Sequence, residues 1–237
     1  MTMSAWPALR TILYDGWVMR FSDGFTRRAN SVSPLYPSTL DINQKITTCE
    51  GIYKSLGQPT VFKMTEDIHP DSLDGILNER GYAINAPTSV QIADLDDTDS
   101  TSDSDIVVTE QLDDHWLDQF FRKSGLDERY LVTLREMLGR IISKRGLFSI
   151  AAGDDVIAFG LAVMDSDYVG LYDILTDRNY RRQGLGRRIS REMMRWGKAN
   201  GAKTAYLQVM LNNPPALRLY DEIGFKEAYK YWYRLKA

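Results

Sequence analysis

The stretch Arg181-Arg182-Gln183-Gly184-Leu185-Gly186-Arg187 is the most specific pattern in this chain of 237 residues. It stands between a run typical of a strand and a basic run typical of a helix. Glycine at the fourth and sixth positions lets the backbone turn tightly and approach a ligand, because no Cβ obstructs it. The loop would then present several free N–H groups at the start of a helix, which suits a phosphate group.

Two familiar phosphate-binding loops do not fit this stretch. A dinucleotide fingerprint requires a glycine where Ile189 stands, and a Walker loop requires Lys and then Ser or Thr directly after its last glycine. A G-x-G pattern alone is weak evidence. Its interpretation therefore depends on the rest of the chain.

A second pattern follows the next expected strand and reads Asn212-Asn213-Pro214-Pro215-Ala216-Leu217-Arg218-Leu219-Tyr220-Asp221-Glu222-Ile223-Gly224-Phe225. Asn213 suits a helix N-cap, the prolines suit the first turn, and Gly224 suits the end of the helix. Local helix physics accounts for these features. It does not require Asn and Tyr seven residues apart, nor the Leu-Tyr-x-x-x-Gly-Phe ending.

Taken together, the two patterns make residues 106–237 resemble the GNAT superfamily of N-acetyltransferases. The loop matches that family's Arg/Gln-x-x-Gly-x-Gly/Ala signature through Arg181, Gly184 and Gly186. The later segment matches the pattern Asn-x-x-Ala-x-x-Leu-Tyr-x-x-x-Gly-Phe through Asn213, Ala216, Leu219, Tyr220, Gly224 and Phe225. The resemblance implies a mixed α/β fold, in which a central and mostly antiparallel sheet is flanked by helices and preceded by a smaller α/β domain.

The resemblance further implies an enzyme that uses acetyl-CoA as co-substrate and transfers the acetyl group directly to an amine. Loop amides would hold the pyrophosphate, strand backbone near Leu175 would bind the pantetheine arm and polarise the thioester carbonyl, and Tyr220 would point its phenol at the thioester sulfur. A neutral phenol with a pKa near 10 can protonate the departing thiolate, although a tyrosine that merely packs is the alternative. The expected cofactor-binding residues are Ile174, Leu175, Thr176, Arg181, Arg182, Gln183, Gly184, Leu185, Gly186, Arg187, Asn213 and Tyr220.

The general base does not follow from the resemblance. Some family members carry a glutamate base on the fourth strand, and the matching position here is Gly170. Asp173 is the nearest carboxylate on that strand and could act through a chain of waters. A carboxylate on the surface or in a turn is an equal alternative, so Asp173 enters as a candidate catalytic residue beside Tyr220.

Residues 94–105 form the clearest break in the chain, because apart from Leu95 they are all Asp, Ser or Thr. Such a segment buries little area and repels itself, which predicts a linker. Residues 1–93 predict a small α/β domain, with strands over 17–21, 25–32, 60–64 and 88–92 and helices over 42–56 and 70–80. Residues 106–237 predict the acetyltransferase domain, in the order helix, helix, three meandering strands, helix, strand, helix, strand.

The first half contains no chemical motif, but it echoes the second. Ile52-Tyr53-Lys54-Ser55-Leu56-Gly57 repeats the spacing of Leu219 to Gly224, and each run precedes a strand. This is similar to tandem acetyltransferases whose first half is a truncated GNAT-like domain without the phosphate loop. We expect this half to bind no CoA by itself, and to pack on the catalytic domain and shape the acceptor side.

Composition sets the remaining expectations. Hydrophobic residues make up 43% of the chain and charged residues 26%, which is typical of a soluble globular protein. A net charge of −3 implies no bulk affinity for nucleic acid or acidic membranes, no apolar run reaches the roughly 20 residues of a membrane helix, and no secretory signal is visible. With one cysteine, Cys49, and two histidines, His69 and His115, neither a disulfide nor a metal site is expected.

We therefore expect a cytoplasmic enzyme whose acceptor is a small-molecule amine or a peptide. A non-catalytic acyl-CoA sensor, an enzyme for a longer acyl group and an acetyltransferase of protein N-termini or lysines stay open. The oligomeric state, a homodimer included, also stays open.

Overall fold

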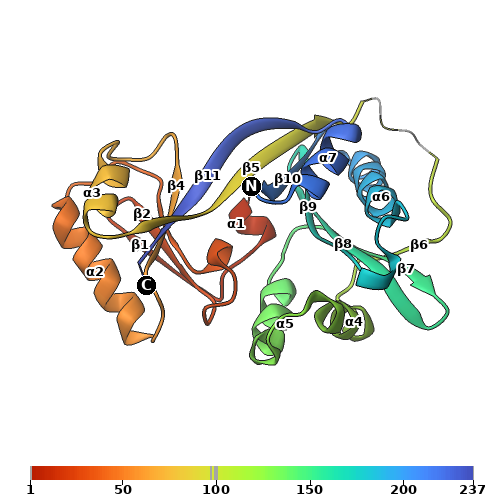
Figure 1. Cartoon of the computed structure of the whole chain (residues 1–237), viewed down its shortest axis with the longest axis horizontal. Coiled ribbons are helices and arrows are strands. Elements are labelled where there is room, and N and C mark those ends of the chain that lie inside the picture. Colours follow the sequence, from red (N-terminus) through yellow and green to blue (C-terminus); the bar gives the residue numbers. More distant parts are fainter. Residues whose placement is uncertain (1, 97, 99–100, 237) are drawn as a thin grey trace.

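The computed structural model describes residues 2–96, 98 and 101–236 (Figure 1). Its strands are β1 (Arg10–Tyr14), β2 (Trp17–Phe21), β3 (Val32–Pro34), β4 (Val61–Thr65), β5 (Ala83–Asp94), β6 (Ile106–Thr109), β7 (Arg145–Ala152), β8 (Asp155–Asp165), β9 (Tyr168–Thr176), β10 (Thr204–Met210) and β11 (Lys226–Leu235). Its α-helices are α1 (Thr2–Ala5), α2 (Ile42–Ser55), α3 (Leu73–Glu79), α4 (Asp114–Ser124), α5 (Leu131–Gly139), α6 (Leu185–Ala199) and α7 (Pro214–Glu222).

All of these strands join one sheet, in the order β1-β2-β3-β4-β11-β5-β10-β9-β8-β7-β6. Over the described residues, β3 with β4 and β9 with β10 are the parallel pairs, and the other neighbours are antiparallel. The expected mixed, mostly antiparallel sheet flanked by helices is confirmed.

The sheet crosses the boundary between the two halves of the chain. β5, from the first half, lies between β10 and β11, and β11 in turn pairs with β4. Figure 1 shows β5 and β11 arching side by side from one lobe to the other. The two halves therefore share strands and do not meet through side chains alone.

Helices cover the sheet on both faces, and three apolar clusters hold them there. In the first half, α2 and α3 pack on β2 to β4 around residues such as Phe62 and Tyr53. In the second half, α6 packs on one face through Ile189 and Met193. Helices α4 and α5 pack on the opposite face, around Phe159. Burial of these apolar side chains is the main stabilising contribution to the fold.

Most of the expected elements are present, but the strand expected over 25–32 is wrong. A 3₁₀ turn spans Arg27–Ala29, and β3 begins at Val32. Asn30 explains the turn, because its side-chain amide donates to the carbonyls of Phe25 and Thr26 while its Oδ1 accepts from the Ser22 N–H. These side-chain bonds replace the ladder bonds that a strand would need.

The acidic segment 94–105 leaves the end of β5 and returns along α6, with residues 97, 99 and 100 outside the described part. Asp103 accepts two hydrogen bonds from the Arg188 guanidinium, at 2.7 and 2.8 Å, and its N–H donates to Glu192. Leu95 is buried in the same cluster as Ile189. The described part of the segment is thus held against the helix by opposite charge.

Within the described residues, no helix is long and apolar enough to span a membrane, and no group of three or more potential His, Cys, Asp or Glu ligands gathers. Cys49 is fully buried beside Met19, and burial raises the pKa of its thiol to about 12. The thiol is therefore protonated at neutral pH and packs as a small apolar side chain.

Candidate active site

The two central strands of the second half pair over part of their length and then separate. β9 and β10 are paired from Tyr168 with Thr204 to Leu171 with Leu207, and beyond that point the ladder ends. A cavity of about 250 Å³ opens where they diverge. Its walls include Asp173 and Ile174 from β9, Gln208 and Met210 from β10, Asn213 and Tyr220 around α7, and Arg28 from the first half.

A β-bulge in β9 forms one wall of this cavity. Phe159 of β8 pairs with Leu175 and Leu161 pairs with Tyr172, so Asp173 and Ile174 together stand opposite the single residue Gly160. Asp173 has a φ of +49°, which is unusual for a residue with a side chain. A bulge interrupts the ladder and leaves backbone groups without partners. The backbone expected to bind the cofactor, at Ile174 to Thr176, therefore lies at and just after the bulge.

The phosphate-loop pattern adopts the conformation that its glycines suggested. Arg182 and Gly184 both have positive φ, +62° and +79°, and α6 begins at Leu185. A Cβ built on Gly184 would contact no atom within 4 Å, so the loop is open at that point. Because the first N–H groups of a helix have no intrahelical acceptor, the turn that starts at Leu185 presents donors to this open side.

The other residues of the loop differ in their exposure to solvent. Arg181, Arg182 and Gln183 are exposed, whereas Leu185 is buried and anchors the start of α6. A Cβ on Gly186 would lie 3.4 Å from Leu219 and 3.8 Å from the Thr176 hydroxyl. The structure therefore brings the loop, the end of β9 and α7 together. The Arg187 side chain forms an ion pair with Glu222 of α7.

Helix α7 carries the second pattern and closes the cavity. The Asn213 side chain accepts a hydrogen bond from the Ala216 N–H at 3.3 Å, so it caps the helix as its sequence position indicated. Tyr220 lies about two turns further on and is half-buried, with its ring 6.0 Å from that of Phe225. Burial raises the pKa of the Tyr220 phenol to about 12, so the group is neutral and carries its proton at pH 7.

Asp173 has the environment of a perturbed carboxylate. Its Oδ2 is buried without a hydrogen-bond partner among the described residues. Burial raises the pKa of the carboxyl to about 6, although the positive charge of Arg28 opposes the shift. A carboxylate with a raised pKa in a cleft is a candidate for proton transfer. Asp173 and Tyr220, the two predicted catalytic residues, line the same cavity.

The sequence led us to expect that the first half shapes the acceptor side, but it did not indicate which residue of that half would do so. Arg28 lines the cavity, and its guanidinium carbon lies 4.7 Å from the centre of the Trp6 ring and 5.7 Å from that of Tyr172. Tyr172 in turn shares a 2.8 Å hydrogen bond with Tyr206 of β10. No motif surrounds Arg28, because its position depends on how the two halves meet.

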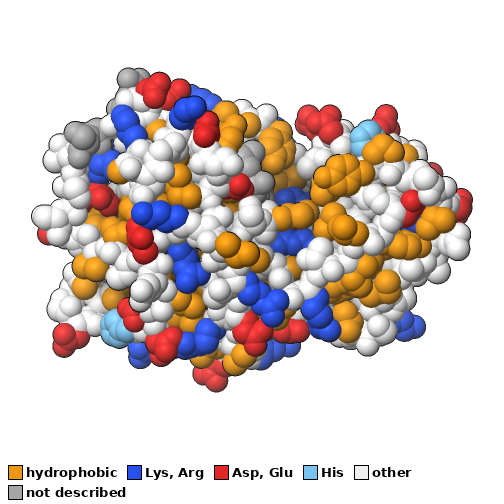
Figure 2. Space-filling model, turned by 180° about the vertical axis from the view of Figure 1, so that it is seen from behind, with side chains coloured by type: hydrophobic (Ala, Val, Ile, Leu, Met, Phe, Trp, Pro, Cys, Tyr) orange, Lys and Arg blue, Asp and Glu red, His pale blue; other side chains and the backbone are white. Residues whose placement is uncertain are grey.

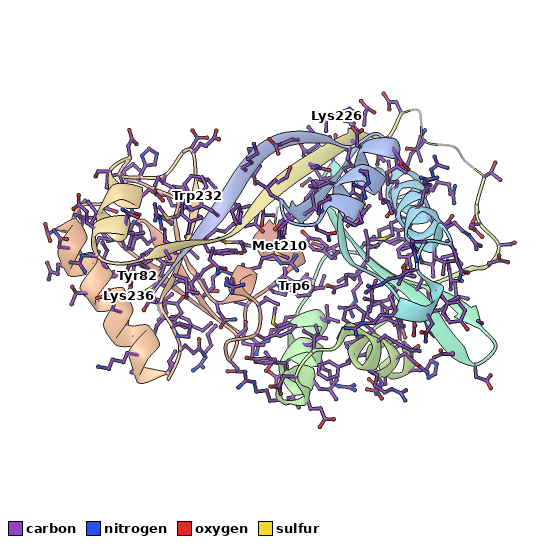
Figure 3. All side chains as sticks on the ribbon, viewed as in Figure 1. Trp6, Tyr82, Met210, Lys226, Trp232 and Lys236 are labelled. Atoms are coloured by element: carbon purple, nitrogen blue, oxygen red, sulfur yellow. The ribbon has the colours of Figure 1, made fainter. Side chains whose placement is uncertain are left out.

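Residues from both faces of the sheet line the cavity. Ala216 and Tyr220 belong with the apolar cluster beneath α6, whereas Trp6, Tyr172 and Tyr206 belong with the cluster on the α4 and α5 side. Figure 3 shows Trp6 and Met210 near the middle of the molecule, where the lobes meet. The side chains around the gap between β9 and β10 therefore come from both faces of the sheet.

Comparison with known proteins agrees with this architecture. The model of the family described as probable histone acetyltransferase Rv0428c C-terminal matches residues 1–234. An uncharacterized N-acetyltransferase YobR from Bacillus subtilis is 26% identical over 239 residues, which cover 98% of this chain and 95% of the relative. The ribosomal protein bS18-alanine N-acetyltransferase of Escherichia coli is 32% identical over 81 residues, 34% of this chain and 55% of its own.

Solved structures show the same fold at low sequence identity. A GCN5-related N-acetyltransferase from Kribbella flavida superposes with a TM-score of 0.71 at 14% identity, over 97% of this chain and 90% of its own. A tandem GNAT protein from the clavulanic acid pathway superposes with a TM-score of 0.62 at 10% identity, over 81% and 69%. Fold and family agree on the GNAT class of N-acetyltransferases. The chain belongs to the family of the Rv0428c C-terminal acetyltransferase region.

Proposed function

We propose that this acetyltransferase takes its acetyl group from acetyl-CoA and transfers it directly to a primary amine. One observation carries the proposal: Tyr220 and Asp173 line the cavity between β9 and β10, and Gly186 in the first turn of α6 lies near Thr176 at the end of β9. Acetyl-CoA supplies a thioester. The amine nitrogen forms a bond to its carbonyl carbon, the carbon–sulfur bond breaks, the amine loses one proton and the CoA sulfur gains one.

The residues at the start of α6 fit the phosphate end of CoA. The open space above Gly184 and the unpaired N–H groups of the first helical turn suit a pyrophosphate. The exposed Arg181 and Arg182 add positive charge at the same place. The backbone of Ile174 to Thr176 would bind the pantetheine arm beside the bulge, and Asn213 would contact it from α7.

Tyr220 would donate the proton that the CoA sulfur gains, and Asp173 would accept the proton that the amine loses. With a pKa near 12, the Tyr220 phenol holds its proton at neutral pH and would act as the general acid that protonates the CoA sulfur as the carbon–sulfur bond breaks. Asp173 is mostly ionised at pH 7 and could accept the amine proton, directly or through water. A lysine-like amine costs about 4–5 kcal/mol to deprotonate at pH 7, since each pKa unit is worth 1.36 kcal/mol.

The experiment that tests the proposal combines binding with turnover. We expect calorimetry to show acetyl-CoA binding, and thiol release to depend on an added amine from a panel of amines, polyamines, amino acids and peptides. Binding without release for any member would favour an acyl-CoA sensor. A stronger preference for a longer acyl-CoA would instead assign a different acyl group.

A second candidate is acetylation of a protein N-terminus. Its support is the 81-residue similarity to the bS18-alanine N-acetyltransferase of E. coli, which acts on a ribosomal protein by its name. A peptide with an N-terminal alanine therefore belongs in the panel, and its selective acetylation would favour this candidate.

A further inference from the structure

Arg28 is held in a fixed position at the cavity. The buried Arg20 guanidinium donates a 2.6 Å hydrogen bond to the Arg28 carbonyl and another to the Trp6 carbonyl, so one side chain fixes the backbone at both residues. The Arg28 guanidinium then lies against the rings of Trp6 and Tyr172. Such stacking leaves the planar edge of the guanidinium, with its N–H donors, free to bind an anion.

Among the described residues, Arg28 forms no ion pair, although the chain contains 32 acidic residues. By contrast, Arg234 pairs with Asp74 and Arg195 with Glu192. Asp173 is near enough for the Arg28 charge to act on its pKa, but the Asp173 Oδ2 has no hydrogen-bond partner. A positive and a negative group therefore stand in the same cavity without joining each other.

Lys63 does not line the cavity, but it is a second cation on the same side of the molecule that feels the charge of Arg28. Its Nζ lies 4.1 Å from the centre of the Tyr231 ring, and its pKa falls to about 8 because of burial and of the charges of Arg28 and Arg20. The buried Tyr233 Oη, which also feels the charge of Arg28, has no hydrogen-bond partner among the described residues. Mutually repelling cations beside an unused hydroxyl create a positive potential that favours an anion. Figure 2 shows Lys and Arg side chains in the recess between the lobes.

We propose that the acceptor is a primary amine that also carries a carboxylate, such as an amino acid, and that Arg28 binds this carboxylate while Asp173 faces the amine. The proposal rests on the acetyl transfer proposed above and adds the class of acceptor. Arg28 is on the α4 and α5 side of the sheet and Tyr220 on the α6 side. The carboxylate is thereby bound on the face opposite the phosphate loop, which leaves the amine to reach the thioester through the gap.

A carboxylate suits this arrangement better than an uncharged group. The two parallel N–H donors of a guanidinium match the two oxygens of a carboxylate, and such charge-assisted pairs are strong. An amine without a carboxylate would gain nothing from Arg28, whose half-buried guanidinium would stay without an anionic partner. Arg28 would therefore be the residue that separates amino acids from their decarboxylated counterparts.

Matched pairs of acceptors test the proposal. Thiol release would be measured with alanine and ethylamine, phenylalanine and 2-phenylethylamine, histidine and histamine, together with an alanyl tripeptide amide. We expect kcat/KM to favour the carboxylated member of at least one pair by tenfold or more. Arg28→Met, which keeps an apolar stem against Trp6, should lower that ratio by about tenfold to a hundredfold, the usual effect of losing a hydrogen bond to a charged group.

Further variants separate binding from folding. Arg28→Lys should recover part of the preference for the carboxylated acceptor, because lysine keeps the positive charge but lacks the two parallel N–H donors of the guanidinium. Arg27→Met is the matched control on the same 3₁₀ turn, since Arg27 is exposed and does not line this cavity. Thermal melting would confirm that all three variants fold, and calorimetry should give each one the wild-type affinity for acetyl-CoA.

Each remaining outcome has a definite meaning. Equal kcat/KM within every pair, or a ratio that Arg28→Met leaves unchanged, overturns the acceptor class but leaves acetyl transfer intact. Acetylation of the peptide amide alone also overturns it, and supports the protein N-terminal candidate. Binding of acetyl-CoA without release for any acceptor overturns the proposed function, and the acceptor class with it.

Discussion

Arg234 of β11, in the second half, forms a bidentate ion pair with Asp74 of helix α3, in the first half. Its Nε donates to one carboxylate oxygen at 2.9 Å and its Nη2 to the other at 2.5 Å. Trp232 adds a 2.8 Å hydrogen bond to the same carboxylate. Arg234 is buried and the Asp74 side chain is 31% exposed, so this pair, which lowers the pKa of Asp74, is partly sheltered from screening and links β11 to the other half.

Cutting the chain between Asp96 and Asp103 tests how far the halves depend on each other. We expect the nicked protein to stay assembled and active. Residues 106–237 alone should be unfolded or aggregated, because removal of β5 exposes the backbone edges of both β10 and β11. Circular dichroism and gel filtration would follow the isolated fragment. A soluble fragment that melts cooperatively and acetylates the same acceptor with unchanged specificity would make the first half an appendage.

Gly184→Glu should abolish most of the affinity for acetyl-CoA. The substitution places a negative side chain in the open space where the pyrophosphate is proposed to bind, and strains a residue whose φ is +79°. Gly201→Glu is the matched control, because Gly201 has a φ of +93°, follows the other end of α6 and is equally open. Calorimetry would compare the three proteins. Wild-type affinity in Gly184→Glu would mean that the phosphates bind elsewhere.

Tyr220→Phe should lower kcat while acetyl-CoA still binds. The ring that packs near Phe225 is retained and only the proton donor is lost, and such a loss typically costs 10²- to 10⁴-fold, less where water substitutes. Tyr229→Phe, on the exposed part of β11, serves as the control. Rates would be measured at saturating acceptor. An unchanged kcat would assign Tyr220 a packing role or show that chemistry does not limit turnover.

Asp173 should give the pH profile an acidic limb. Since burial raises the pKa of its carboxyl from 3.8 to about 6, the base is protonated below pH 6. We therefore expect log kcat/KM to rise with unit slope up to about pH 6, and this limb to vanish in Asp173→Asn. Asp154→Asn, in an exposed turn, should keep it. An acidic limb that persists unchanged in Asp173→Asn would remove Asp173 from proton transfer.

The same shift predicts a change in stability. Between pH 3.8 and 6 the native state binds this proton more tightly than the unfolded state, so stability falls as pH rises through this window. The full effect is at most about 3 kcal/mol, at 1.36 kcal/mol per pKa unit. Asp173→Asn should therefore be more stable than the wild type in urea at pH 7.5 and lose that advantage near pH 4. An equal difference at both pH values would contradict the raised pKa.

The elements that the sequence predicted well are those with local signals. The period of Ile46, Cys49 and Tyr53 predicts α2, and Asn213 with the following prolines predicts the start of α7. The elements that escaped prediction depend on distant partners. β6 is four residues long and is fixed by its pairing with β7, and the turn at Arg27–Ala29 depends on the hydrogen bonds of Asn30.

Prediction of the site followed the same division. The positions of Gly184 and Tyr220 could be predicted because the residues around them repeat a spacing that the chemistry requires. The raised pKa of Asp173 could not, because it results from burial at a bulge opposite Gly160. Arg28 could not be predicted either. It lies 145 positions before Asp173 in the chain, and no signal in the sequence shows that the two residues line the same cavity.

The place of β11 between β4 and β5 also sets an order of events during synthesis. β4 ends at Thr65, but the strand that covers its edge ends at Leu235 and leaves the ribosome 170 residues later. At about 5–20 residues per second, that interval is roughly 10–35 s. During this interval the edge of β4 in the nascent first half has no strand paired with it. The edge of β4 is thus completed by a strand made much later in synthesis, and a holding chaperone would bind at that edge in the interval.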